Sequence, residues 1–175
     1  GGGKYVHLNE EQGRELALEA INQGINVFDA HHRYGLAEKV FGKILTPELV
    51  KMTKVSAYHE GEHFKLLSDS STLLDKIDIL WISDLDDPSL YEKGVRIYTE
   101  IKLRYGSRFE MGITTEDPGL AYRFMAEHPE CDLFMVPVYL GIDPFMFQFL
   151  TDAKKNGKFT FAIKPFLDGQ LLGEY

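Results

Sequence analysis

The sequence alternates between short apolar segments and longer amphipathic ones, and no other feature limits the possible fold as much. Residues 9–24 show the first helix pattern, because Asn9 is a suitable N-cap, Gln12 follows it by three positions, and Gly24 is a suitable end. On the same criteria we expect helices over residues 9–24, 36–45, 65–76, 90–106, 118–129 and 144–157. We expect strands over residues 25–30, 51–58, 77–83, 109–114, 132–139 and 159–166.

Alternating helices and strands, with strands that are apolar on both faces, predict an α/β fold in which helices cover a parallel sheet. Such a sheet is commonly either a doubly wound open sheet or a (β/α)8 barrel. No Gly-x-Gly-x-x-Gly motif follows an expected strand, so the dinucleotide-binding signature of the open sheet is absent. We therefore expect one domain over residues 1–175, a (β/α)8 TIM barrel that is incomplete at both ends, since a typical barrel has about 250 residues.

Charge and cysteine content narrow the functional classes. The net charge is −8 without a cluster of Lys and Arg, which argues against binding to nucleic acid or an anionic membrane. No stretch approaches the roughly 20 apolar residues of a membrane span. The one cysteine, Cys131, excludes an internal disulfide, so we expect a reducing, cytoplasmic compartment. Residues 1–4 contain neither Met nor the apolar region of a signal peptide, so we expect a longer native protein.

Three polar residues near the ends of the first two expected strands, Asp29, Tyr34 and Lys54, form a chemically coherent set. A tyrosine has an ordinary pKa near 10, and an adjacent ammonium lowers it by stabilising the phenolate. A carboxylate beside the lysine would keep it charged and in place. Such a trio can donate a proton to a carbonyl oxygen. Spacing alone favours a second interpretation: Asp29 as a helix cap, Tyr34 as a half-buried loop aromatic, and Lys54 as a solvated side chain.

Five segments, spread over nearly the whole chain in the same order, resemble the aldo-keto reductase family. The first, GINVFDAHHRYGLAEKVFGKIL (24–45), is similar to the family signature with its Asp and its Tyr-Gly. The others are the strand with the catalytic lysine at 52–55, IDILWIS (77–83), FEMGITT (109–115) and AIKPFLDGQLLGEY (162–175), which resembles the seventh strand and the loop after it.

The resemblance implies an NAD(P)H-dependent carbonyl reductase that acts on a small aldehyde or ketone. It places Tyr34 as the proton donor, Lys54 as the residue that tunes it, and Asp29 as the residue that holds Lys54. The fourth catalytic residue of the family is a histidine, and Ser83 stands at its position. A serine hydroxyl can donate a hydrogen bond to a carbonyl, but it cannot relay protons as imidazole does.

The same resemblance implies NADP(H) as the cofactor and favours NADPH over NADH. The Ser-Asn pair that binds the nicotinamide carboxamide in many members corresponds to Thr114 and Thr115. Ile163 replaces the aromatic residue that stacks on the nicotinamide, and Lys164 follows it. We therefore expect Thr114, Thr115 and Lys164 to contact the cofactor. The segment that binds the adenosine phosphate lies beyond Tyr175 in this family.

Two alternatives remain open. The replaced family residues also fit a catalytically silent barrel with a binding or regulatory role. The pair His31 and His32, with His59 and His63 further along, resembles the histidines of metal-dependent amidohydrolases. Because His31 and His32 are adjacent and followed by Arg33, we expect their side chains to diverge. We therefore expect exposed loop histidines and no metal site.

Overall fold

The computed structural model describes residues 8–167 and 169–173. Its centre is a parallel sheet of six strands in the order β1-β2-β3-β4-β5-β6. The strands are β1 (Val27–Asp29), β2 (Val50–Ser56), β3 (Ile79–Ser83), β4 (Glu110–Thr114), β5 (Leu133–Pro137) and β6 (Phe159–Ile163). The α-helices are α1 (Glu10–Asn22), α2 (Ala37–Ile44), α3 (His63–Leu74), α4 (Pro88–Tyr105), α5 (Pro118–Glu127) and α6 (Pro144–Lys155). The 3₁₀ helices are η1 (Ala57–His59) and η2 (Gln170–Leu172).

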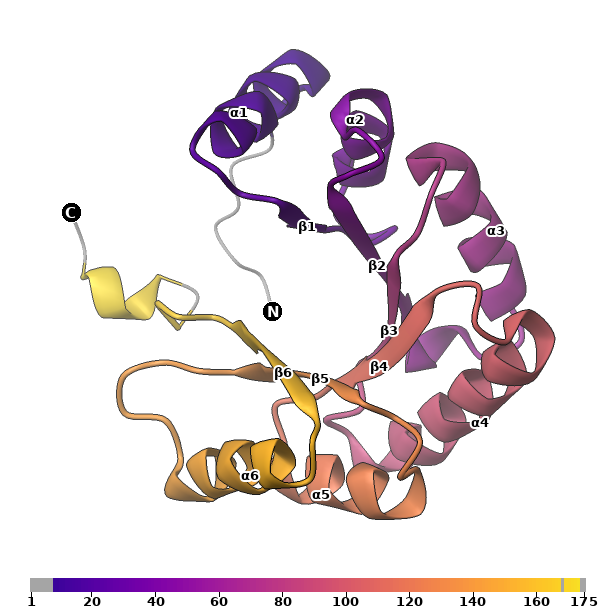
Figure 1. Ribbon diagram of the computed structural model, residues 1–175, viewed down its shortest axis with the longest axis vertical. Coiled ribbons are helices and arrows are strands. Elements are labelled where there is room, and N and C mark those ends of the chain that lie inside the picture. Colours follow the sequence, from indigo (N-terminus) through magenta and orange to yellow (C-terminus); the bar gives the residue numbers. More distant parts are fainter. Residues whose placement is uncertain (1–7, 168, 174–175) are drawn as a thin grey trace.

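Strands that are neighbours in the chain are also neighbours in the sheet, which is the order of a barrel wall. A doubly wound sheet would instead reverse its strand order part-way. Figure 1 shows the sheet curled into an arc with the helices on its outer side, and the arc opens between β1 and β6. The expected α/β fold is thus confirmed as a six-stranded half-barrel, and closure by eight strands stays a prediction.

Three of the helices begin with the same dipeptide, Asp-Pro. The aspartate side chains of Asp87, Asp117 and Asp143 accept hydrogen bonds of 2.8–3.0 Å from backbone N–H groups in the first turns of α4, α5 and α6. The proline that follows each has no N–H to leave unpaired and has a helical φ already. Asn9 and Gln12 form the expected capping box at the start of α1.

Four expected strands end earlier than their apolar patterns indicated, and in two of them a turn gives the reason. The strand expected over 51–58 ends at Ser56, because the Ser56 hydroxyl accepts a hydrogen bond of 3.2 Å from the Tyr58 N–H and the chain turns into η1. The strand expected over 159–166 ends at Ile163, since Lys164 has a φ of +56° that is incompatible with an extended strand. Asp168, in the segment 162–175 compared above, lies outside the described residues.

Apolar side chains fill both faces of the sheet. Between the sheet and the helices, the core includes Leu80, Ile82, Tyr98, Phe124 and Phe134, all nearly inaccessible to solvent. The concave face carries a second cluster of Met52, Ile79, Trp81 and Met135, with Phe161 against it. The Trp81 ring explains why β4 has a glycine at position 112, because a Cβ on Gly112 would lie 2.5 Å from that ring. The barrel interior is therefore packed rather than hollow.

Helix α2 makes a close contact with the C-terminal turn of α3 that only glycine permits. A Cβ on Gly42 would lie 1.6 Å from the carbonyl oxygen of Leu73. We expect Gly42→Ala to lower the free energy of unfolding by about 1–3 kcal/mol, as overpacking does, measured from the urea midpoint. The control Gly13→Ala lies in α1, where the nearest atom would be a Val40 methyl at 3.6 Å. It should stabilise the protein by about 0.5–1 kcal/mol, and equal midpoints would contradict the close contact.

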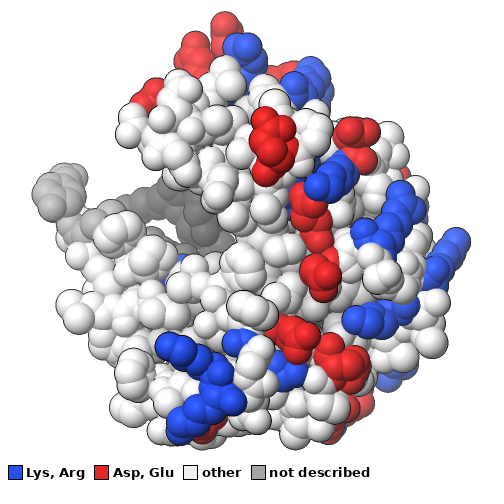
Figure 2. Space-filling view, in the orientation of Figure 1, with Lys and Arg blue, Asp and Glu red and all other residues white. Residues whose placement is uncertain are grey.

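The outer surface carries charges of both signs. On the face shown in Figure 2, basic and acidic side chains are interspersed over the outer helices, and the middle of the face is largely uncharged. Within residues 8–167 and 169–173, no helix combines the length and the apolar composition needed to cross a membrane.

Candidate active site

The C-terminal ends of β1 and β2 bring together the three residues that the sequence singled out. Asp29 ends β1 and Lys54 lies on the adjacent β2, and both belong to the inward-facing set that alternates along each strand. The Lys54 ammonium donates a hydrogen bond to Asp29 Oδ2 and lies 3.5 Å from the carbonyl oxygen of Ala30. The ion pair therefore joins two strands across the concave face at the barrel mouth.

Burial defines the chemistry of this pair. Lys54 is 6% exposed, so the interpretation of Lys54 as a solvated side chain is wrong. Burial raises the pKa of Asp29 and lowers the pKa of Lys54, and the ion pair opposes both shifts because each group stabilises the charged form of the other. Asp29 Oδ1 is buried without a hydrogen-bond partner among the described residues. Removal of either charge would therefore leave the other charge largely buried and without its partner.

Tyr34 lies in the loop between β1 and α2 and completes the set. The Lys54 Nζ atom lies 5.2 Å from the centroid of the Tyr34 ring, within the range of a cation–π contact. Tyr34 is 53% exposed, so a substrate can reach it. The site thus has an accessible phenol beside a buried ammonium, which is in turn held by a carboxylate.

The histidines of the mouth differ from the exposed, divergent pair that the sequence predicted. His31 is 2% exposed, His63 is 3% exposed, and the rings of His31 and His32 stack with their centroids 4.1 Å apart. The ring of His59, in η1, contacts His32 edge-on at 5.0 Å. The prediction of divergence was wrong because the turn after β1 directs both side chains toward β2 and η1. No group of three or more His, Cys, Asp or Glu in the described chain is placed to hold a metal ion.

Ser83 ends β3, in register with Ser56 of β2. Its hydroxyl donates a hydrogen bond of 3.3 Å to Asp84, and Asp84 also accepts hydrogen bonds of 3.2–3.3 Å from the guanidinium of Arg33. Ser83 is therefore linked to the Tyr34 loop through Asp84 and Arg33. Sequence reasoning missed the contact between Arg33 and Asp84. Asp84 directly follows the end of β3, and Arg33 lies in the loop after β1.

The three residues expected to contact the cofactor lie at the ends of β4 and β6. Thr114 is on the inward-facing side of β4, beside Met135 of β5. Thr115 is buried, and its hydroxyl donates a hydrogen bond of 2.8 Å to Asp86 of the preceding loop. The Lys164 ammonium donates a hydrogen bond to Glu116 and so ties the end of β6 to the loop after β4. These residues lie at the same end of the sheet as Lys54, on other strands.

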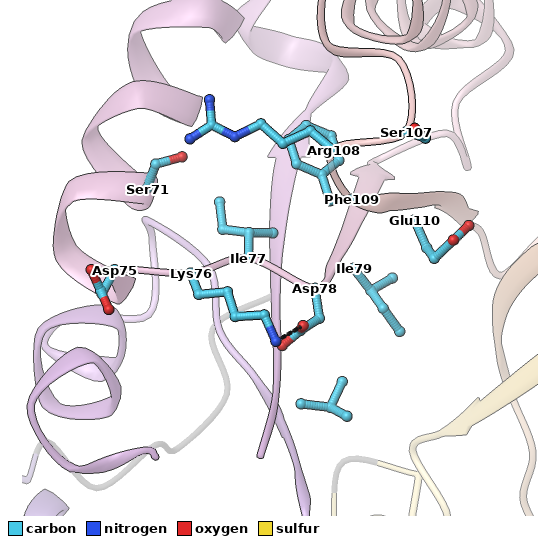
Figure 3. A pocket seen from close by; sticks show the side chains of 11 residues that line it. Ser71, Asp75, Lys76, Ile77, Asp78, Ile79, Ser107, Arg108, Phe109 and Glu110 are labelled. Carbon is cyan, nitrogen blue, oxygen red and sulfur yellow. Dashed lines mark ion pairs between the residues drawn. The ribbon is translucent and has the colours of Figure 1, made fainter. Parts of the chain in front are cut away.

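A pocket of about 480 Å³ lies at the opposite end of the strands. Figure 3 shows Arg108 extending toward Ser71 of α3, with the Lys76–Asp78 ion pair of 2.5 Å below them. The pocket lies at the N-terminal ends of β3 and β4. In a (β/α)8 barrel this end contributes to stability, whereas active sites lie at the C-terminal end. We therefore place the candidate active site at the Asp29–Lys54–Tyr34 end.

Comparisons with solved structures identify the fold to which this geometry belongs. An aldo-keto reductase from Brucella melitensis matches with a TM-score of 0.72 and 18% identity, over 90% of this chain and 65% of that one. An aldo-keto reductase from Klebsiella pneumoniae in complex with NADP and acetate matches with a TM-score of 0.69 and 22% identity, over 96% of this chain and 63% of that one. This chain has the aldo-keto reductase fold.

The resemblance to aldo-keto reductases is thus confirmed at the level of the fold. The apo aldo-keto reductase from Bacillus halodurans matches with a TM-score of 0.68 and 22% identity, over 94% of this chain and 59% of that one. The chain therefore spans less than two thirds of the length of these aldo-keto reductases. No protein-family model matches the chain, and a search of curated protein sequences gives no match.

Proposed function

We propose that this protein reduces aldehydes or ketones with NADPH, and that Tyr34 donates the proton. The observation that carries the proposal is the convergence of an exposed phenol, a buried ammonium and a carboxylate at the mouth of an aldo-keto reductase fold. An NADP complex of a protein with the same fold supports the choice of cofactor. The cytoplasmic location expected from the single cysteine belongs to the same proposal.

The chain's own residues supply the proton and the electrostatic setting. Bound NADPH would supply a hydride to the carbonyl carbon, and negative charge then develops on the carbonyl oxygen. The Tyr34 hydroxyl gives its proton to that oxygen, and the adjacent Lys54 ammonium stabilises the phenolate that remains. Asp29 keeps Lys54 oriented toward the mouth and favours its charged form. The Ser83 hydroxyl donates to Asp84 at 3.3 Å, and with substrate bound it would rotate to donate a hydrogen bond to the carbonyl oxygen, without relaying a proton.

The residue types at the ends of β4 and β6 are suited to binding the nicotinamide half of the cofactor. Thr114 presents a hydroxyl that can bond a carboxamide, and Lys164 brings positive charge to the same end of the sheet. Both lie at the C-terminal end of the sheet, the end that carries the catalytic trio, so we expect a bound nicotinamide at that end. Thr115 would act by fixing the two loops around it, because its hydroxyl is already bonded to Asp86.

A binding and turnover experiment tests the proposal. Trp81 is the sole tryptophan of the sequence and is fully buried in the concave face below the mouth. Titration of the full-length protein with NADPH should change its fluorescence saturably, whereas urea-denatured protein should show no saturable change. A panel of small aldehydes should then consume NADPH, followed by its absorbance. No binding up to about 1 mM, the upper end of ordinary KM values, would contradict the reductase and favour the catalytically silent barrel.

A further inference from the structure

His31 makes three separate contacts to Arg33 and Tyr34, the second and third residues after it in the Tyr34 loop. Its backbone carbonyl accepts the Tyr34 N–H at 2.8 Å, and its ring Nδ1 accepts the Arg33 N–H at 3.0 Å. Its ring also packs against the Tyr34 ring, with centroids 5.2 Å apart. One residue therefore holds the proposed proton donor twice, through its backbone carbonyl and through its ring, while its Nδ1 atom holds the preceding residue Arg33.

His31 is itself held rigidly. It is 2% exposed, and it stacks on His32, which contacts His59 of η1. The three imidazoles and the phenol form a continuous row of rings from η1 to Tyr34. Tyr34, in contrast, is more than half exposed at the end of this row. The row therefore ends in an exposed phenol, and the backbone of that residue is held by the turn after β1.

The bond from Arg33 requires a neutral His31 ring, because a protonated imidazole has donors at both nitrogens and cannot accept. Burial, together with the positive charge of the neighbouring His32, Arg33 and Lys54, lowers the pKa of His31 to about 3. The ring is therefore neutral at neutral pH and carries its proton on Nε2, which is buried without a hydrogen-bond partner among the described residues.

We propose that His31 is a positioning residue: its Nδ1 acceptor closes the turn after β1, and this turn holds the Tyr34 phenol beside the Lys54 ammonium. The inference rests on the proposed reductase function of Tyr34. It assigns to His31 a role that acts through Tyr34, without contact between His31 and the substrate. Asn at the same position can accept the same bond, because an Asn side chain readily accepts the N–H two residues later.

The test compares two variants that separate the acceptor from the ring. His31→Phe keeps an aromatic ring and loses the acceptor, whereas His31→Asn keeps the acceptor and loses the ring. We expect His31→Phe to lower kcat by about tenfold to hundredfold with KM nearly unchanged, the scale of a small misplacement of a catalytic group. His31→Asn should keep most of kcat. His128→Phe, after α5 at the opposite end of the strands, controls for loss of a histidine.

A second readout needs no turnover. The ultraviolet titration of the parent minus that of Tyr34→Phe gives the ionisation curve of Tyr34 alone. The same subtraction in the two His31 backgrounds should show a higher midpoint in His31→Phe and a parental midpoint in His31→Asn, because the phenol leaves the ammonium only when the turn opens. If the parent reduces no carbonyl, the proposed function fails, yet these midpoints still test the positioning role.

The outcomes are decisive even if His31→Phe does not fold. A folded His31→Asn that has lost kcat, or that has a shifted Tyr34 midpoint, would overturn the proposal, because the acceptor would then be insufficient. Equal midpoints in parent, His31→Phe and His31→Asn would overturn it as well. A parental His31→Asn beside an impaired His31→Phe supports it.

Discussion

Replacing Tyr34 by phenylalanine should lower turnover by roughly 10²–10⁴, the range for the loss of a positioned general acid. The phenol is the most accessible group of the proposed trio, since Tyr34 is 53% exposed, whereas Lys54 is 6% exposed and the Asp29 side chain 29%. The ring remains in Tyr34→Phe, so its packing on His31 and its contact with Lys54 persist. The free energy of unfolding should change by no more than about 1 kcal/mol, the net scale of one hydrogen bond.

Steady-state kinetics with the best aldehyde of the panel, together with urea unfolding, measure both parts of this prediction. Tyr58→Phe is a matched control, because Tyr58 is 61% exposed in η1 at the same end of the sheet. It should retain parental turnover. NADPH binding should persist in both variants. If Tyr34→Phe were as active as the parent, the proton would have to come from another group at the mouth. His59 would be the next candidate, because His31 is only 2% exposed.

Lys54→Met should cost both activity and stability. Turnover should fall as it does in Tyr34→Phe, because the phenolate loses its adjacent ammonium. The free energy of unfolding should fall by about 3 kcal/mol, the lower end for removal of one partner of a buried pair, since 29% of the Asp29 side chain is still exposed. Equilibrium urea unfolding at neutral pH measures this loss.

The pH dependence and a double variant separate the two effects. Burial already raises the pKa of Asp29, and Lys54 is the residue whose charge and hydrogen bond oppose that shift. A carboxyl whose folded pKa exceeds its unfolded pKa is most stabilising at low pH, and the stability is lost as pH rises through the folded pKa. The deficit of Lys54→Met should therefore shrink on acidification toward about pH 4. Asp29→Asn combined with Lys54→Met should recover much of the stability at neutral pH and none of the turnover. Stability that stayed lost in the double variant would contradict the unpaired carboxylate as its cause.

Particular residues show how much of the fold and of the candidate site the sequence alone could predict. Apolar periodicity gave all twelve expected elements their correct type, because a two-sided apolar strand and a one-sided helix leave distinct local patterns. The trio of Asp29, Tyr34 and Lys54 was predicted from the family resemblance, whereas spacing alone favoured separate structural roles; the structure brings the three residues together because parallel strands have their C-terminal ends at one edge. Strand ends were less predictable, as at Lys164, because its positive φ is set by the turn that follows β6 rather than by local apolarity.

The sequence by itself thus determined the order of elements, the half-barrel type of fold and the end of the sheet that carries the candidate site. Only the tertiary structure decided which groups at that end are buried and which are paired. His31 is sealed by His32 and by the Tyr34 loop, and Arg33 meets Asp84 from a loop 51 positions away. Such contacts depend on how three loops fold against one another, and no local pattern encodes the distance between them. Burial and pairing in turn fix the charge of each group, and so the tertiary structure sets the chemistry of the mouth.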